Sequence, residues 1–128
     1  MNPWVLIVDD DAEFGRLLAR RIEARHRNLR CQVCSSPTDA LEVLSEDYAL
    51  LLVDLDMPEL DGAEFLEAAV AAGVPRSRIV IHSSHTAEDL HARFDLGECL
   101  AVINKLDRAQ QAALDLILAE VDRRAAQS

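Results

Sequence analysis

The sequence is poor in aromatic and in basic residues. Aromatic side chains make up 4% of its 128 residues, so Leu, Ile, Val and Ala have to build the core. Lys and Arg number 13 against 23 Asp and Glu, which gives a formal net charge of −10. A field of that sign repels nucleic acid and anionic membranes, because proteins bind both through Lys and Arg. We therefore expect no direct binding to nucleic acid.

Long hydrophobic runs are also missing. No apolar run approaches the roughly 20 residues of a membrane span, and Val5–Val8 is too short for the core of a signal peptide. We expect a cytoplasmic protein that does not enter the membrane. Half of the residues are hydrophobic, which argues against intrinsic disorder. The length fits a single domain over residues 1–128 with a substantial core.

Cysteine is scarce, and its three copies cannot all pair within the chain. Cys31 and Cys34 have the CxxC spacing, but redox motifs of that spacing sit at the start of a helix. Here the pair lies in an extended segment, Leu29–Cys34, where side chains three apart face opposite ways. No second pair completes a zinc site. We expect Cys31, Cys34 and Cys99 to be small, half-buried thiols, and the odd count suits a reducing compartment.

Short apolar segments alternate with longer segments of helical period. The predicted strands are Trp4–Val8, Leu29–Cys34, Leu50–Val53, Ile79–Ile81 and Leu100–Ile103. The first predicted helix carries Phe14, Leu17, Leu18 and Ile22, the second begins at Ser36-Pro37, and the third covers Glu64–Ala72 and stops at Gly73. The fourth begins at Thr86 and carries Leu90 and Phe94. The fifth begins near Asp107 and carries Ala113, Leu114, Ile117, Leu118 and Val121. Five β-α units predict an α/β fold: a (βα)5 doubly wound, five-stranded parallel sheet in a flavodoxin-like three-layer sandwich.

Chemically active residues follow four of the predicted strands. They are Asp9, Asp10 and Asp11 after the first strand, Asp54 after the third, Ser83 after the fourth and Lys105 after the fifth. The carboxyl ends of parallel strands share one edge, so these side chains should meet there. A single Asp after a strand is more often structural, and we assign Asp11 to the start of the first helix.

The acidic residues at this edge need a cation. Two carboxylates about 4 Å apart repel by about 4 kcal/mol at an effective dielectric near 20. Lys105 offsets about one charge, and the remaining charge suits a hard divalent ion with oxygen ligands, which points to Mg2+. A carboxylate beside such an ion can accept a phosphoryl group.

Two motifs make the sequence similar to a known family. Val5–Asp10 reads Val-Leu-Ile-Val-Asp-Asp, and Leu51–Pro58 ends in Asp-Leu-Asp-Met-Pro and is followed by Asp61-Gly62. The chain resembles, over essentially its whole length, the receiver domain of two-component response regulators. The resemblance implies a cytoplasmic phosphoacceptor with Mg2+ as its cofactor. It is not an enzyme in the usual sense, because it catalyses at most its own phosphorylation and dephosphorylation.

The resemblance also implies a role for each site residue. By position, Asp54 matches the phosphoacceptor, Asp9 and Asp10 match the acidic pair, and Asp10 is the more direct magnesium ligand. The remaining matches are Asp56, whose backbone carbonyl would face the metal, Ser83 as the switch hydroxyl, and Lys105 as the lysine that contacts the phosphoryl group. The implied partners are a histidine kinase or histidine phosphotransfer protein, and a downstream protein or C-terminal output domain. A homodimer is a further expectation, because Leu116 and Ala112 lie off the main apolar stripe of the last helix.

The four histidines receive separate interpretations. Asp56 and His85 stand two residues after Asp54 and Ser83, positions that in the family influence the lifetime of the phosphoryl group; solvated surface is an equal alternative for His85. His82 lies within a strand and is predicted to be a buried histidine with a hydrogen-bonding partner. His26 and His91 are expected to be exposed.

The sequence departs from the family pattern at three positions. Val102 stands where the family usually carries Tyr or Phe, Leu106 where it usually carries Pro, and Ser84 where Ala or Gly is common, so that Ser84 is an alternative to Ser83 as the switch hydroxyl. The usual Lys-Pro bond is cis, and a cis bond before a non-proline residue costs about 2.5–4 kcal/mol. We therefore expect a different path for the loop after Lys105 and an altered read-out of phosphorylation.

Two other functions fit parts of the same pattern. Asp54-Leu-Asp56 also matches the DxD of haloacid-dehalogenase-type phosphatases, although those place DxD on the first core strand and need a cap that this chain lacks. A pseudo-receiver, acting as an interaction module without phosphorylation, would fit the missing aromatic and proline residues. Phosphoryl loading separates these alternatives.

Overall fold

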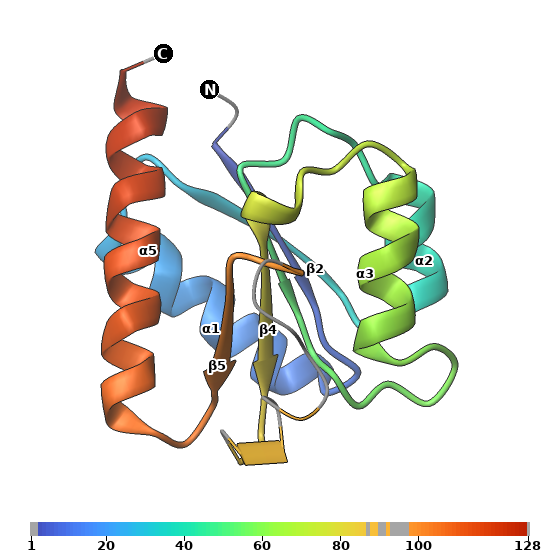
Figure 1. Cartoon of the computed structure of the whole chain (residues 1–128). Helices are drawn as coiled ribbons and strands as arrows, with labels where there is room; N and C mark the ends of the chain where they lie inside the picture. Colours follow the sequence, from blue (N-terminus) through green and yellow to red (C-terminus); the bar gives the residue numbers. More distant parts are fainter. Residues whose placement is uncertain (1–2, 87, 90–91, 93–97, 128) are drawn as a thin grey trace.

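The computed structural model describes residues 3–86, 88–89, 92 and 98–127. Five parallel strands form one sheet in the order β2-β1-β3-β4-β5, as Figure 1 shows. Their bounds are β1 Trp4–Val8, β2 Arg30–Cys34, β3 Leu50–Val53, β4 Ile79–Ser83 and β5 Ala101–Asn104. The helices are α1 Ala12–Arg25, α2 Pro37–Val43, α3 Gly62–Ala71 and α5 Arg108–Ala126, with a 3-10 turn at Arg76–Arg78. The predicted five-stranded parallel α/β fold is confirmed.

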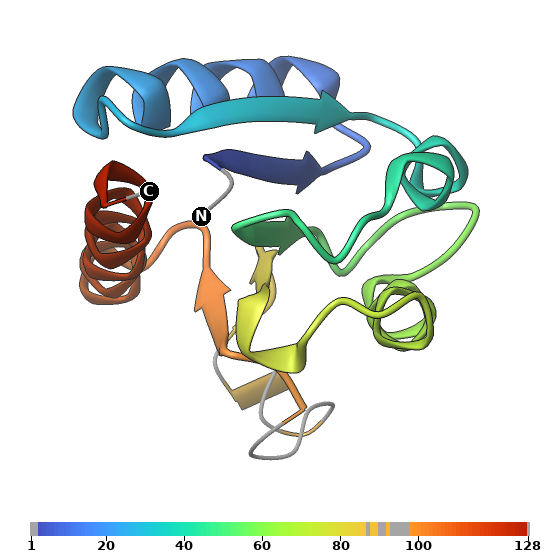
Figure 2. The ribbon, with the colours of Figure 1, turned by 90° about the horizontal axis from the view of Figure 1, so that it is seen from above.

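The sheet is covered on both faces. In the view from above, α1 and α5 lie on one side of the sheet and α2 and α3 on the other (Figure 2). Alternate strand residues supply the two cores: Leu6, Val8, Leu51 and Val53 pack with Phe65 and Leu66 of α3, whereas Val5, Ile7, Leu50 and Leu52 pack with Ile22 of α1 and with Leu114 and Leu118 of α5. This period of two in fully apolar strands is the pattern of a sheet buried on both faces.

Polar residues fix the starts of the helices. Asp11, Ser36 and Asp61 each accept a hydrogen bond from a backbone N–H in the first turn of α1, α2 and α3. Asp107 does the same for α5, with bonds from the N–H groups of the second and third helical residues. The predicted starts at Asp11, Ser36-Pro37 and Asp107 are confirmed. At the other end of α3, Gly73 takes a φ of 103° that favours glycine, and it stops the helix as predicted.

Three strands differ slightly from their predicted bounds, and β2 begins at Arg30, one residue later than predicted. β4 continues two residues further, so Ser83 is its last residue and does not follow it. β5 begins at Ala101 and ends at Asn104, so Leu100 precedes the strand and is 44% exposed. The predicted helix that begins at Thr86 lies largely outside the described residues, as do Leu90, His91 and Phe94.

The predicted inner stripe of α1 is partly wrong. Leu17 is 57% exposed, whereas Gly15, Ala19 and Ile22 are buried. A Cβ on Gly15 would lie 2.8 Å from a methyl of Val33, so these small residues let the helix lie close to the sheet. The Leu17 side chain points away from the contact between α1 and the sheet, so it stays exposed although it is large and hydrophobic.

Two further exposure predictions are wrong. Ala113 lies on the exposed side of α5, where Leu114, Leu118 and Val121 are the buried residues. His26 is 8% exposed, because it ends α1 at the contact with α5 and donates its backbone N–H to the carbonyl of Ile22. Leu116 is 73% exposed, in agreement with its predicted place off the apolar stripe.

The outer face of α1 and the residues after it are basic. Residues 16–30 contain six Arg and one Glu, although the chain as a whole is acidic. All six Arg side chains are exposed, and within the described part of the chain only Arg25 forms an ion pair, 3.2 Å from Asp115 on α5. This positive surface is confined to one side of the sandwich.

The cysteines are free and half-buried, as predicted. Burial, followed by the nearby Glu23 carboxylate, raises the pKa of Cys31 to about 12. Burial also raises the pKa of Cys34 and of Cys99. Protonated thiols are poor nucleophiles, which agrees with a structural interpretation. Of the helices in the described ranges, none combines the length and the apolar character needed to cross a bilayer.

Candidate functional site

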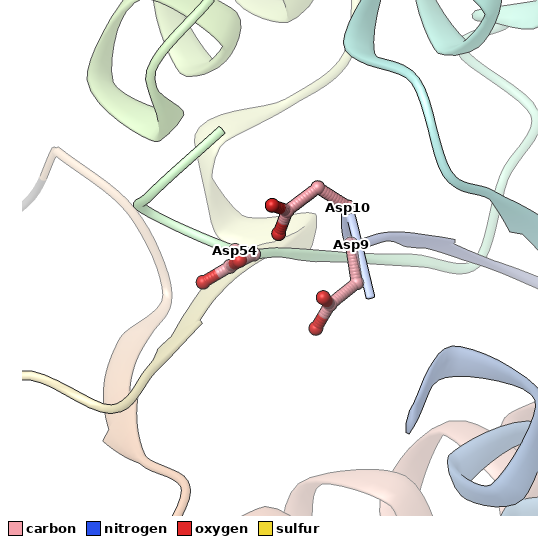
Figure 3. A group of neighbouring side chains, drawn as sticks. All are labelled: Asp9, Asp10 and Asp54. Carbon is pink, nitrogen blue, oxygen red and sulfur yellow. The ribbon is translucent and has the colours of Figure 1, made fainter. Parts of the chain in front are cut away.

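Three carboxylates meet at the carboxyl edge of the sheet. Asp9 follows β1 and Asp54 follows β3; the two strands are in register at Val8 and Val53, and the Asp54 N–H donates to the Val8 carbonyl at 2.8 Å. Asp9, Asp10 and Asp54 each offer a carboxylate oxygen, and these three oxygens lie within 4.8 Å of one another. Figure 3 shows the three side chains grouped at this edge. The structure thus brings together the acids that the sequence placed on separate strands.

Lys105 enters this group from β5. Its Nζ lies 2.7 Å from Asp9 Oδ2 and 3.6 Å from Asp54 Oδ1. The ammonium group also lies 4.4 Å from the centre of the Phe14 ring, which is within the range of a cation–π contact. Phe14 comes from the first turn of α1, so the lysine is held between the acids and an aromatic ring.

The acidic cluster carries more negative charge than Lys105 can offset. Burial raises the pKa of Asp54 well above its usual range, and Lys105 opposes this rise while the Asp9 charge and a hydrogen bond with Asp10 add to it. A divalent cation among the three carboxylates would offset the cost of keeping Asp54 charged in this buried, acidic place. The donor set is all oxygen, which suits magnesium rather than zinc or copper. The residues present therefore fit a magnesium ion.

Ser83 is the buried serine of the pair at the end of β4. Its exposed fraction is 0%, whereas Ser84 is exposed. The Ser83 Oγ accepts a hydrogen bond from the His85 N–H at 3.2 Å. The Ser83 carbonyl accepts a bond of 2.7 Å from the N–H of Lys105, which ties the end of β4 to the residue that carries the cation.

Asp56 and His85 lie against each other beside the carboxylates. His85 Nε2 is 2.6 Å from Asp56 Oδ2, and His85 Nδ1 is 3.9 Å from Asp89 Oδ2. The His85 side chain is 24% exposed, so it is not freely solvated, whereas that of Asp56 is 58% exposed. Two side chains from different loops thus form a rim next to Asp54.

His82 is a buried histidine with a partner, as predicted. It is 3% exposed, and its Nε2 lies 3.0 Å from the Nε2 of Gln111 on α5. Burial, followed by the charge of Lys105, lowers the pKa of His82 to about 4. The ring is therefore neutral at pH 7, and Nε2 accepts a hydrogen bond from the Gln111 amide.

Two residues near the site were not anticipated from the sequence. Phe14 was expected in an apolar stripe, and it contacts both Lys105 and the ring of His82, whose centre is 5.9 Å away. Asn104, the last residue of β5, makes hydrogen bonds to the loops on both sides of the site. No motif singles out this residue, although an Asn that ends a strand is a residue type that often bonds to nearby backbone.

Comparison with known proteins decides the family. A sequence model of the response regulator receiver domain matches residues 5–106. The chain belongs to this family. The receiver is similar to the transcriptional regulatory protein CpxR homolog of Haemophilus influenzae, with 30% identity over 97 residues that cover 75% of the receiver and 42% of the relative. It is also similar to the DNA-binding transcriptional regulator NtrC of Proteus hauseri, with 30% identity over 118 residues that cover 81% and 24% of the two chains.

Solved structures agree on the fold of the receiver. A response regulator receiver domain protein from Clostridium thermocellum superposes with a TM-score of 0.76 at 19% identity and covers 97% of both chains. A sensor protein from Polaromonas sp. JS666 superposes with a TM-score of 0.73 at 26% identity, covering 98% of the receiver and 99% of that chain. The receiver spans less than half the length of the two curated relatives. Its family serves two-component signalling rather than classical enzyme chemistry, and receivers bind Mg2+ at an acidic cluster of the kind found here.

Proposed function

We propose that this receiver accepts a phosphoryl group on Asp54 from a histidine kinase or histidine phosphotransfer protein and thereby changes its protein contacts. The observation that carries the proposal is the position of the Asp54 carboxylate. It is buried at the end of a central strand, 3.6 Å from an ammonium group and within 4.8 Å of two further carboxylates. A nucleophile, a cation for phosphoryl oxygens and a metal-binding pair thus share one edge.

The chemistry follows from this arrangement. An Asp54 oxygen attacks the phosphorus of a phosphohistidine, the phosphorus–nitrogen bond breaks, and the leaving imidazole keeps the electron pair of that bond and takes a proton from solvent. Lys105 stabilises one phosphoryl oxygen by its charge, and the Ser83 hydroxyl donates a hydrogen bond to another. Asp9, Asp10, Asp54 and the backbone carbonyl of Asp56 would hold Mg2+, which supplies charge neutralisation for the phosphoryl oxygens when it is bound.

Asp56 and His85 have a second role in the proposal. Their side chains form the rim beside Asp54 and control the approach of the water that hydrolyses the acyl phosphate. We expect substitution of either one to change the half-life of the phosphorylated protein without abolishing loading. Equal decay rates in parent, Asp56→Ala and His85→Ala would refute this role.

The proposal extends to the cellular setting. Residues 1–128 act as one receiver domain in the cytoplasm, and the output passes to a downstream protein or to an output domain beyond this chain. The chain itself makes no direct contact with nucleic acid, because of its net charge of −10. Sedimentation with and without beryllofluoride tests for a homodimer formed on phosphorylation, for which the exposed Leu116 offers an apolar contact.

Intact-protein mass spectrometry after incubation with acetyl phosphate and Mg2+ tests the phosphoacceptor role. We expect a mass increase of one phosphoryl group in the parent and none in Asp54→Asn. Asp47→Asn is the matched control, because Asp47 is exposed at the opposite end of β3 and should load like the parent. A parent that takes no phosphoryl group would favour a pseudo-receiver, and repeated turnover of a generic phosphomonoester would favour a phosphatase.

A further inference from the structure

Asn104 connects the two loops that flank the phosphoryl-binding edge. It is 9% exposed, at the end of β5. Its side-chain amide donates a hydrogen bond to the backbone carbonyl of His85 in the loop after β4. Its Oδ1 accepts bonds from the backbone N–H groups of Leu106, at 2.7 Å, and Asp107, at 3.0 Å, in the loop after Lys105. One side chain thus spans the loop of the hydroxyl and the loop of the cation.

The backbone of Asn104 is fixed as well. Its N–H donates to Gln110 Oε1 at 2.6 Å, and its carbonyl accepts from Gln111 Nε2 at 2.9 Å. Both glutamines belong to the first turns of α5. The backbone of Asn104 is therefore anchored to α5, and its side chain contacts the loop after β4.

A continuous series of hydrogen bonds runs from the Ser83 hydroxyl to the start of α5. The His85 N–H donates to Ser83 Oγ, and the carbonyl of the same residue accepts from the Asn104 amide. The Asn104 oxygen then accepts from the N–H of Asp107, the residue that caps α5. A change in the hydrogen bonding of Ser83 would therefore alter the hydrogen bonds of Asp107, the cap of α5, through His85 and Asn104.

The usual means of linking these loops are absent from this chain. Val102, which stands where the family usually has an aromatic residue, is half-buried and has no polar side-chain atom with which to follow the Ser83 hydroxyl. Leu106, which stands where the family usually has proline, is 81% exposed, and its peptide bond with Lys105 is trans. The side chain of Asn104 supplies a fixed connection at this place in the fold.

We propose that Asn104 is a positioning residue that holds the Lys105 loop against the Ser83–His85 loop and transmits phosphorylation of Asp54 to the start of α5. The inference rests on the proposed phosphoacceptor function. With the connection intact, the ammonium group and the hydroxyl are held at a fixed separation across the incoming phosphoryl group. Without it, the bond from the Lys105 N–H to the Ser83 carbonyl remains, but the His85 end of one loop is no longer held to the other, and loading slows although the metal-binding carboxylates that follow β1 and β3 are untouched.

The variant Asn104→Asp separates this role from a purely structural one. A carboxylate still accepts bonds from the N–H groups of Leu106 and Asp107, but it cannot donate to the His85 carbonyl. Gln110→Glu is the matched control: it makes the same amide-to-acid change in the first turn of α5, and its Oε1 can still accept from the Asn104 N–H. Asn104→Ala removes both kinds of bond and is the second variant.

The measurements are the rate of loading from acetyl phosphate, the Mg2+ affinity by calorimetry, the urea unfolding midpoint, and the amide NMR shifts of Leu106 and Asp107 on addition of beryllofluoride. For Asn104→Asp we expect loading about tenfold slower, the equivalent of one hydrogen bond. We also expect an Mg2+ affinity within about twofold of the parent value. The beryllofluoride-dependent shifts should be lost in Asn104→Asp and kept in Gln110→Glu.

Each outcome decides a separate point. Parent-like loading and NMR shifts in Asn104→Asp, with a slow and destabilised Asn104→Ala, would reduce Asn104 to a structural cap and overturn the inference alone. Slow loading in Gln110→Glu as well would assign the effect to added negative charge, which also overturns it. A parent chain that takes no phosphoryl group overturns both the inference and the proposed function.

Discussion

Replacement of His82 by Gln should remove a large part of the acid sensitivity of folding. Burial lowers the pKa of His82 to about 4 from an ordinary 6.5, so between these values the unfolded chain binds a proton that the folded chain does not. The stabilising contribution is complete above pH 6.5 and is lost as the pH falls toward 4. The parent should lose about 2 kcal/mol of unfolding free energy from this group between pH 7 and pH 5, and about 3 kcal/mol by pH 4.

The assay is urea unfolding followed by circular dichroism at pH 7, 6, 5 and 4 for the parent and His82→Gln. Glutamine does not titrate, and its amide oxygen can still accept a hydrogen bond from Gln111, so the contact of 3.0 Å has a substitute. Asp54 and the other acids titrate in both proteins, and their contributions therefore cancel in the difference between the two curves.

The informative quantity is how the free-energy difference between the two proteins changes with pH. We expect His82→Gln to be less stable than the parent at pH 7 and to gain on it steadily as the pH falls. A difference that stays constant within about 0.5 kcal/mol from pH 7 to pH 5 would mean that His82 titrates normally in the folded protein. Burial would then not govern its protonation, and the reasoning would be refuted.

Three further predictions concern packing and the metal. Gly62→Ala should lower the unfolding free energy by about 1–3 kcal/mol, because the new Cβ would lie 2.8 Å from the carbonyl oxygen of Asp54. Gly15→Ala should lower it less than Gly62→Ala does, because its Cβ would meet a side-chain methyl of Val33 instead of backbone and because helix propensity improves; equal losses in urea unfolding would contradict this. Mg2+ at about 100 times its dissociation constant should stabilise the parent by about 2.7 kcal/mol in thermal unfolding and Asp54→Asn far less, and equal shifts would place the ion elsewhere. Tyr48→Phe should cost about 1 kcal/mol, since the hydroxyl donates to Gln32 at 2.7 Å, and an unchanged urea midpoint would show that water replaces the bond.

The sheet was predictable because its residues carry a local signal. Apolar runs such as Leu50–Val53 can be buried on both faces only in a parallel sheet covered by helices, and the order of elements then fixes the fold. The inner face of α1 was less predictable, because the distance between helix and sheet selects residues by size. Gly15 and Ala19 allow close approach, and Leu17 is left outside although it is more hydrophobic.

The candidate site shows the same division. The places of Asp9, Asp54 and Lys105 follow from strand ends and could be predicted, because each depends only on the chain around it. The burial of His26 and the bonds of Asn104 depend on contacts between distant segments. Such contacts leave no periodic trace in the sequence, so the structure was needed to find them.

The basic surface of α1 makes the molecule an electric dipole. Six of the 13 basic side chains lie in residues 16–30 with one of the 23 acidic ones, which leaves 22 acidic and seven basic side chains in the rest of the chain. A charged object that approaches within a Debye length, about 8 Å at physiological ionic strength, exerts a torque on such a molecule before any contact is made. An acidic surface therefore turns the protein so that the outer face of α1 is directed toward it, whereas the edge that holds Asp9, Asp10 and Asp54 is itself acidic and is repelled by it.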